Sequence, residues 1–296
     1  MRPALSSLTA VLLALVACSC AWDRGEAQQD PSGPSSVYVA LGDSYSSAPL
    51  NPDVADEQCL RSTRNYASRL ARALSVQLTD ATCAGAQTAD VRAAQDLPEG
   101  RGGGSVPPQI DAVGRQTELV TIGLGGNDGG LFTAIVRGCL AAGSDSAGCV
   151  RALERSGERS DFRRTGEAIA AVVEDVRRRA ADGVAIVLVD YPRIVDSARP
   201  CPPLPGVEQE SLAAVANAQR QLNRTLAQAA ADSGAVFLDL EETSQTHDLC
   251  SADPWVNDGV TKPGIAARWH PLPQEQAAVA RLLEGLLVDR GLAPTG

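Results

Sequence analysis

Lysine, histidine and aromatic residues are scarce in this chain of 296 residues. Lys262 is the only lysine, His247 and His270 are the only histidines, and aromatic residues make up 3% of the chain. Two histidines leave little room for a histidine-rich zinc site, and we expect neither a metal nor a cofactor.

Positive charge is also in short supply. The chain has 26 Lys+Arg against 36 Asp+Glu, which gives a formal net charge of -10. Binding to nucleic-acid phosphates requires clustered positive charge, so no nucleic-acid partner is expected. Beyond its first residues the chain lacks a long apolar run, which excludes a protein that spans a membrane many times. The length is sufficient to bury a large core.

The amino-terminal residues have the pattern of an export signal. Arg2 precedes an apolar run, residues 4–17, that is too short to span a bilayer comfortably. The run ends in Leu15-Val16-Ala17-Cys18, which resembles the lipobox of bacterial lipoproteins. We therefore expect a signal peptide at 1–17 and a lipid on Cys18 that anchors the protein to the outer face of the cell membrane. The alternative is an ordinary signal peptide, with Cys18 incidental and the protein secreted.

The next segment, residues 18–36, is rich in Gln, Asp, Pro, Ser and Gly and has no apolar periodicity. This composition predicts a flexible tether. No second linker follows, so we expect one folded domain at 37–296.

Six cysteines follow the tether, at positions 59, 83, 139, 149, 201 and 250. An even number in an exported protein indicates disulfides. The sequence alone leaves several pairings open, of which the simplest is sequential: Cys59–Cys83, Cys139–Cys149 and Cys201–Cys250. The absence of a C-x-x-C pair disfavours a metal site. Cys20 is left without a partner.

Short apolar runs alternate with segments of helical spacing along the chain. They predict strands at 37–41, 76–78, 119–124, 184–189 and 236–238, and helices at 64–74, 162–179, 212–231 and 274–288. Strands separated by helices indicate parallel crossovers, and therefore a three-layer α/β/α sandwich with a mostly parallel sheet of about five strands. Ligands of such sheets bind beyond the carboxyl ends of the strands.

Three loops in this arrangement carry residues suited to catalysis: Gly42-Asp43-Ser44, Gly125-Gly126-Asn127-Asp128 and Trp269-His270-Pro271. The first two directly follow predicted strands, and the third precedes the last helix. A serine at the end of a strand can be a nucleophile if a base and an oxyanion hole accompany it. Each loop also has a structural alternative. Asp43 and Ser44 would cap a helix, the second loop would be a glycine-rich turn, and His270 would be structural. The G-x-S-x-G elbow of α/β-hydrolases is absent.

Taken together, the loops resemble those of the SGNH hydrolases, also called the GDSL lipases and esterases. The matching blocks occur in the family's order: Gly42-Asp43-Ser44, Gly85, Gly125-Gly126-Asn127-Asp128 and His270-Pro271. Tyr45 stands where the name-giving motif has leucine. The resemblance covers residues 37–288 and implies a flavodoxin-like sandwich and metal-independent ester hydrolysis. The placement of the cysteines looks like that of the secreted lipase and phospholipase branch, which supports the sequential pairing.

The resemblance also implies a role for each matched residue. Ser44 would attack the ester carbonyl, and His270 would take its proton and later protonate the leaving alcohol. The backbone N–H groups of Ser44 and Gly85 and the side-chain amide of Asn127 would hold the oxyanion.

One position departs from the common family pattern. Many members place an aspartate three residues before the histidine, where this chain has Ala267. The secreted branch uses a backbone carbonyl instead. We therefore predict a Ser–His dyad in which the Ala267 carbonyl accepts a hydrogen bond from the Nδ1–H of His270. Asp258 or Glu275, reaching in through the fold, is the alternative.

Other conspicuous side chains are expected to serve the scaffold. We expect Asp43 and Asp128 to hold loop backbone and the His247-Asp248 pair to be structural. The two tryptophans at positions 255 and 269 either line a substrate pocket or pack the final loop.

The leading functional hypothesis is an exported, monomeric serine esterase or lipase that acts on lipid or other acyl esters. A carbohydrate O-acetyl esterase of the same superfamily is the main alternative, and it would need only a shallow acyl site. An inactive surface-binding module on the same scaffold is disfavoured, because the residues of all four blocks are intact.

Overall fold

The computed structural model describes residues 37–141, 144–159, 161–198 and 200–294. The expected signal peptide, the lipidation site Cys18 and the tether lie outside these residues. In the described part of the chain, no helix combines the length and apolarity that a membrane span requires.

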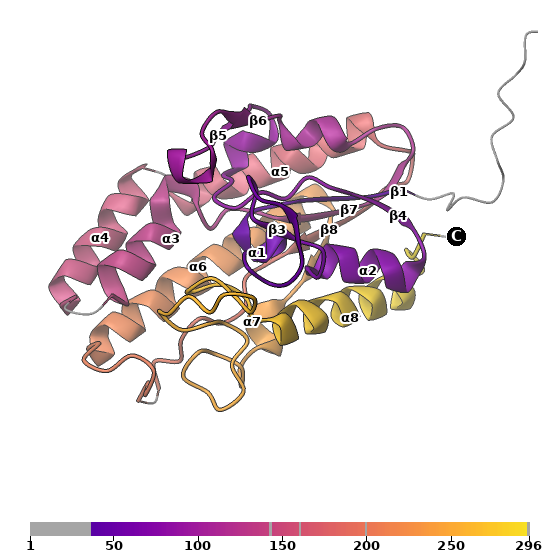
Figure 1. The fold of residues 1–296 in the computed structure, drawn as a ribbon. Helices are drawn as coiled ribbons and strands as arrows, with labels where there is room; N and C mark the ends of the chain where they lie inside the picture. The colour runs from indigo at the N-terminus through magenta and orange to yellow at the C-terminus, as the bar shows by residue number, and fades with distance from the viewer. Residues whose placement is uncertain (1–36, 142–143, 160, 199, 295–296) are drawn as a thin grey trace, which may run out of the picture. The chain divides into compact units, whose positions relative to one another are not determined.

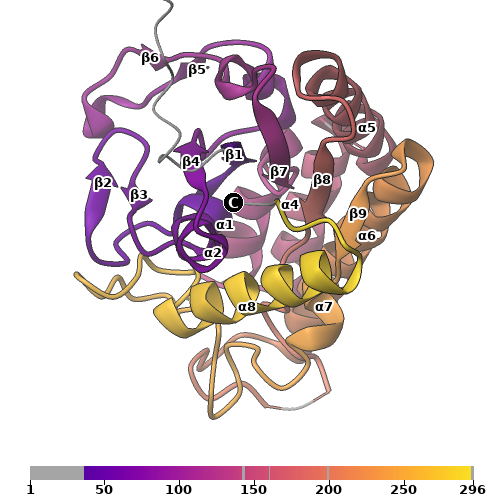
Figure 2. The same cartoon turned by 90° about the vertical axis from the view of Figure 1, so that its right-hand side faces the viewer.

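Five parallel strands form the central sheet, in the order β4-β1-β7-β8-β9. Figure 2 shows the strands side by side in this order. Their bounds are β1 Val37–Gly42, β4 Gln77–Asp80, β7 Thr117–Gly123, β8 Ala185–Val189 and β9 Val236–Leu238. The predicted sheet is therefore confirmed, with boundaries that differ by at most two residues at either end. Because all strands are parallel, the loops after β1 and β7 leave the sheet at the same edge.

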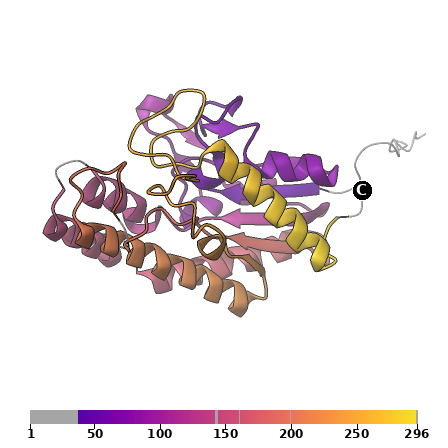
Figure 3. The same cartoon turned by 90° about the horizontal axis from the view of Figure 1, so that it is seen from below.

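Four helices cover the two faces of the sheet (Figures 1 and 3). They are α2 Tyr66–Leu74 and α8 Pro273–Asp289, which contact each other, and α5 Phe162–Arg179 and α6 Gln209–Ser233, which contact each other. Local signals set their ends: the side chains of Asn65 and Asp161 cap α2 and α5, and Gly234, with a φ of 65°, ends α6. These are the four predicted helices.

Strand β1 shows how the sequence sorts side chains between the two layers. Val39 and Leu41 belong to the core under α5 and α6, whereas Tyr38 and Ala40 belong to the core under α2 and α8. The period of two residues is that of a strand, and apolar residues at every position place β1 inside the sandwich.

One long helix, α4 at Ser146–Arg159, was not predicted. Its sequence contains two glycines and few apolar residues, so it lacks a strong helical pattern. Helix α4 packs against α6 and against the helical segment Ala134–Cys139 that follows α3 (Figure 1). The shorter elements are α1 Ser44–Ser47, α3 Leu131–Thr133, α7 Leu240–Thr243, β2 Val54–Asp56, β3 Arg61–Ser62, β5 Gln95–Asp96 and β6 Ser105–Val106.

Three disulfides constrain the loops. They join Cys59 to Cys83, Cys139 to Cys149 and Cys201 to Cys250, which is the sequential pairing. The second bond ties the amino-terminal turn of α4 to the helical segment that follows α3.

Candidate active site

Ser44 is the first residue of the short helix α1, directly beyond the end of β1. The side chain of Asp43 caps this helix by accepting a hydrogen bond from the Tyr45 N–H at 2.9 Å. Gly42 is needed at the turn, because a Cβ there would lie 2.3 Å from the Ser46 Oγ. The structure thus presents Ser44 at the edge of the sheet where ligands bind in this architecture.

As expected, the Asp43 carboxylate accepts a hydrogen bond from the backbone of its own loop. It also connects this loop to two other segments of the chain. The carboxylate accepts hydrogen bonds from the Tyr191 hydroxyl at 2.6 Å and, at 3.4 Å, from the Asn127 amide. The Tyr191 oxygen in turn accepts the Gly126 N–H at 2.8 Å. Burial raises the pKa of Asp43 to about 7, against the opposing effect of the Tyr191 hydrogen bond.

The second and third blocks lie beside the nucleophile loop. Gly85 has a φ of 83°, a conformation that favours glycine. The Asn127 amide donates to the Ala86 carbonyl at 3.0 Å, which links the two blocks. Within the described residues, the backbone N–H groups of Ser44 and Gly85 have no hydrogen-bond acceptor. These two N–H groups are therefore available to a ligand. The Asn127 amide hydrogen that points at Asp43 is also available, because that hydrogen bond is long, at 3.4 Å.

Asp128 has the scaffold role expected of it. Its carboxylate accepts from both the backbone N–H and the hydroxyl of Thr88, at 3.0 and 2.8 Å. It thereby fixes the loop after β7 against the helical turn that follows Gly85.

His270 is oriented by a backbone carbonyl, but by a different one from the carbonyl predicted. Its Nδ1 lies 2.7 Å from the Arg268 oxygen. The Ala267 oxygen instead accepts the backbone N–H of His270 at 3.3 Å and the Asn257 amide at 3.0 Å. The reason is the conformation of Trp269, whose φ of 64° turns the chain so that the Arg268 carbonyl faces the ring. Assignment of this role to Ala267 was therefore wrong by one residue.

The environment of His270 favours its neutral form. The imidazole ring packs against Tyr45 and Phe132, with ring centroids 5.9 and 5.2 Å apart. Desolvation by this packing lowers the pKa of His270 to about 4, and the Arg268 carbonyl opposes the shift. A neutral imidazole whose Nδ1 carries the proton leaves Nε2 as a base.

Neither acidic alternative supports the imidazole. Asp258 forms a salt bridge with Lys262 at 3.1 Å. Glu275 is buried and accepts a hydrogen bond from Gln276 at 2.7 Å, and burial raises the pKa of Glu275 to about 8.

The remaining candidates pack the final loops. His247 stacks on Trp255 with ring centroids 4.6 Å apart, and its Nδ1 lies 2.8 Å from the backbone carbonyl oxygen of Asp253. Asp248 accepts the backbone N–H of Cys250. The carbonyl of Trp269 accepts the Tyr45 hydroxyl at 2.9 Å. Neither tryptophan lines the cavity at Ser44.

A narrow, largely apolar cavity opens beside Ser44. Asp43, Tyr45 and Asn127 line it together with residues that the sequence analysis missed: Leu131, Phe132, Ile135, Tyr191, Ile194 and Leu222. These residues come from separate helices and loops, and no local motif marks them.

The parallel sheet, its serine at the edge and the loops around it define an SGNH-type carboxylic ester hydrolase. A family model described as the GDSL-like lipase/acylhydrolase family matches residues 40–278, so the chain belongs to that family. It is 37% identical over 230 residues to Lipase 2 of Streptomyces coelicolor, covering 74% of each chain. It is 30% identical over 280 residues to a lipase of Streptomyces rimosus, covering 94% of this chain and 96% of that one. Among solved structures, phospholipase A1 from Streptomyces albidoflavus NA297 matches with a TM-score of 0.70 and 26% identity, covering 85% of this chain and 99% of that one.

Proposed function

We propose that this protein is an exported serine esterase or lipase that forms an acyl-enzyme on Ser44, with His270 as the general base. One observation carries the proposal. Ser44 and Asn127 line one cavity, and the imidazole of His270 packs on Tyr45 and Phe132, which line the same cavity. This proximity of side chains from three distant segments supports the roles of nucleophile, base and oxyanion donor that we propose for Ser44, His270 and Asn127.

The first half-reaction acylates the serine. The Ser44 Oγ bonds to the ester carbonyl carbon while its proton passes to the Nε2 of His270. The oxyanion accepts hydrogen bonds from the N–H groups of Ser44 and Gly85 and from the Asn127 amide. The C–O bond to the alcohol then breaks, and His270 returns the proton to the leaving alcohol.

The second half-reaction restores the enzyme. His270 takes a proton from water, whose oxygen attacks the acyl carbon. The Ser44–acyl bond breaks, the proton returns to Ser44 Oγ, and the carboxylic acid is released. Throughout, the Arg268 carbonyl keeps the proton of neutral imidazole on Nδ1 and accepts a hydrogen bond from the imidazolium. It supplies less charge stabilisation than a carboxylate would.

The test is hydrolysis of nitrophenyl esters from acetate to palmitate by the wild type and by Ser44→Ala and His270→Ala. We expect each substitution to abolish most activity. A fluorophosphonate should label Ser44 in the wild type, as mass spectrometry of the peptide would show. Full activity of Ser44→Ala would overturn the mechanism. Activity confined to acetate would favour the O-acetyl esterase instead.

We also propose that residues 1–17 direct export and that Cys18 carries a lipid. The support is the apolar run and the Leu15-Val16-Ala17-Cys18 pattern. Expression of the full chain in a bacterial host with labelled palmitate should give a labelled membrane-bound protein, and Cys18→Ser should give none. Label on the Cys18→Ser protein would contradict this assignment.

A further inference from the structure

Two side chains outside the proposed dyad hold the peptide group that carries one of the proposed oxyanion donors. The Ala84 carbonyl accepts a hydrogen bond from the Arg101 Nη1 at 2.8 Å and another from the Gln95 Nε2 at 3.0 Å. This carbonyl belongs to the same peptide group as the Gly85 N–H. Both side chains therefore act on the opposite end of that donor.

The geometry of the peptide group couples its two ends. The bond between Ala84 and Gly85 is trans, and a planar trans peptide points its N–H away from its carbonyl. Two donors that fix the direction of the carbonyl therefore fix the direction of the Gly85 N–H as well. Hydrogen bonds to the carbonyl also polarise the peptide, which makes its N–H a stronger donor.

Arg101 brings a positive charge to this peptide. Its Nη1 also donates to the Gln58 carbonyl at 3.1 Å, so both acceptors are neutral. Among the residues that the structure describes, no carboxylate forms an ion pair with this guanidinium. A hydrogen bond from a charged donor is stronger than one from a neutral donor, and an unneutralised cation favours negative charge nearby.

One hairpin brings Gln95 and Arg101 to the same oxygen. Gln95 begins β5, which pairs with β6 in the antiparallel direction, and Arg101 ends the helical turn Glu99–Arg101 between the two strands. Three glycines follow at 102–104, with φ values of 92°, 64° and 76°. They return the chain to β6 in a conformation that favours glycine, and so place the guanidinium over the Ala84 carbonyl.

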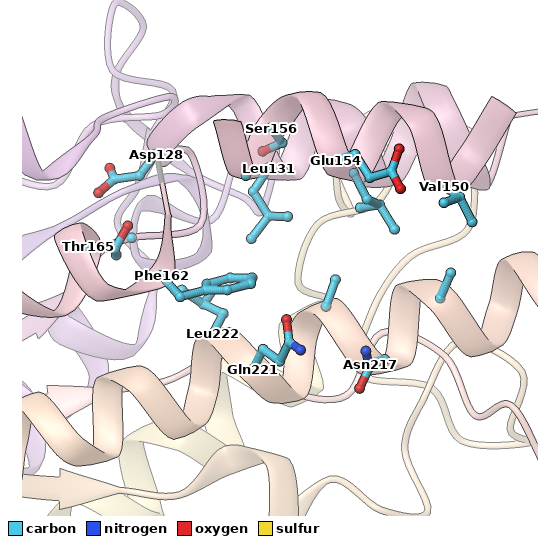
Figure 4. A pocket seen from close by; sticks show the side chains of 15 residues that line it. Asp128, Leu131, Val150, Glu154, Ser156, Phe162, Thr165, Asn217, Gln221 and Leu222 are labelled. Atoms are coloured by element: carbon cyan, nitrogen blue, oxygen red, sulfur yellow. The ribbon is translucent and has the colours of Figure 1, made fainter. Parts of the chain in front are cut away.

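Gln95 and Arg101 lie next to Gly85 but outside the nearby hollows. A Cβ on Gly85 would lie 3.6 Å from the Arg101 Nη2 and 3.7 Å from the Gln95 Nε2. Neither side chain lines the cavity at Ser44, nor the larger hollow of about 360 Å³ between α4 and α6 that Figure 4 shows. Any effect on the reaction therefore passes through the peptide group.

We propose that Arg101 and Gln95 are positioning residues for the oxyanion hole, which hold the Ala84–Gly85 peptide so that its N–H faces the oxyanion. The charge of Arg101 strengthens that donor. This inference rests on the proposed function and adds a source of transition-state stabilisation to it. Because the oxyanion exists only after Ser44 has attacked the ester, the contribution acts on kcat rather than on KM.

The experiment separates the charge of Arg101 from its packing. Arg101→Gln removes the charge, Arg101→Lys keeps it, and Arg61→Gln is the matched control. Arg61 also donates to a backbone carbonyl of this loop, that of Thr82, at 2.7 Å. The N–H of that peptide belongs to Cys83 and donates to the Gly42 carbonyl, so it is not an oxyanion donor.

The readouts are kcat and KM for nitrophenyl butyrate and the affinity for an alkyl trifluoromethyl ketone. The Ser44 Oγ adds to the carbonyl carbon of this ketone while its proton passes to His270. The ketone oxygen becomes an alkoxide, which occupies the oxyanion hole. Its affinity therefore reports the strength of the oxyanion donors and not the stability of the fold.

We expect Arg101→Gln to lower kcat about tenfold with KM within about twofold, which is less than the 10²–10³ of a lost donor because the N–H remains. The affinity for the ketone should fall by a similar factor. Arg101→Lys should retain most of kcat, and Arg61→Gln should keep the wild-type values. Gln95→Met removes the second donor to the same oxygen and should lower kcat in the same direction.

Three results would overturn the proposal. One is an equal kcat in Arg101→Gln and Arg61→Gln, both verified as folded by thermal unfolding. Another is a loss of kcat in Arg101→Gln with unchanged affinity for the ketone. The third is a loss in Arg101→Lys as large as that in Arg101→Gln. Each leaves the proposed function intact if Ser44→Ala is inactive, so the two failures are distinguishable.

Discussion

The hydroxyl of Tyr191 donates a 2.6 Å hydrogen bond to the carboxylate of Asp43, the residue that precedes the proposed nucleophile. The same hydroxyl accepts the N–H of Gly126, which precedes the proposed oxyanion donor Asn127. One side chain, on the loop after β8, thus connects the two blocks whose spacing would determine the proposed oxyanion hole. No motif in the sequence marks it.

Removal of this hydroxyl should impair turnover more than substrate binding. We expect Tyr191→Phe to lower kcat by about tenfold, which corresponds to about 1.4 kcal/mol, with little change in KM. The matched control is Tyr38→Phe, which removes a buried 2.8 Å hydrogen bond to Thr121 away from the site. Steady-state kinetics and thermal unfolding of both variants provide the check. Equal effects on kcat would mean that Tyr191 serves stability alone.

Loss of the Asn127 amide should act mainly on the transition state. We expect Asn127→Ala to reduce kcat by about 10²–10³ with KM within a few fold, because the oxyanion develops only as the ester carbonyl is attacked. Kinetics on one short and one long nitrophenyl ester would measure both constants. A rise in KM with kcat intact would instead assign the amide to ground-state binding.

The activity should persist into acidic solution. His270 must be neutral to accept the serine proton, and desolvation lowers its pKa to about 4. As the pH falls, kcat/KM should therefore decline around pH 4 rather than near the ordinary histidine value of about 6.5. A pH–rate profile, with circular dichroism at each pH to verify folding, tests this expectation. An acid limb centred near pH 6.5 would contradict it.

Glu275 should make stability depend on pH. Burial raises its pKa to about 8, above its unfolded value, so the folded protein binds a proton on this carboxyl more tightly than the unfolded chain does. The contribution of this carboxyl to stability is fully present below its pKa in the unfolded chain, and it is lost as the pH rises through 8. Glu275→Gln should therefore raise the melting temperature relative to wild type more at pH 9 than at pH 5. An equal difference in melting temperature between variant and wild type at pH 5 and pH 9 would show that the carboxyl does not titrate in this range.

The Cys139–Cys149 bond should support α4. Replacement of both cysteines by serine should lower the free energy of unfolding by about 2–4 kcal/mol. Denaturant unfolding of the double variant and the wild type measures the change. Unchanged unfolding would mean that packing alone holds the helix.

Local patterns were sufficient to predict most of the framework. The continuous apolar run of β1 and the amphipathic spacing of α5 mark a buried strand and a surface helix whatever surrounds them. The strand–helix alternation then implies the parallel sheet, and its carboxyl edge directs attention to the loops that hold Ser44 and Asn127. Those inferences needed only the order and periodicity of residues, whereas the roles of Ser44, Asn127 and His270 came from the resemblance to the SGNH hydrolases.

Two features depended on the tertiary structure. The carbonyl that orients His270 belongs to Arg268 because Trp269 adopts a left-handed conformation, which its sequence does not signal. Helix α4 has too weak an amphipathic pattern to be recognised apart from its packing on α6. The sequence by itself therefore determined the sheet, its crossovers and the order of the chemical groups, because periodicity and spacing are local. Tertiary structure decided the imidazole's partner and the side chains that line the cavity at Ser44, because both are set by how separate segments pack together.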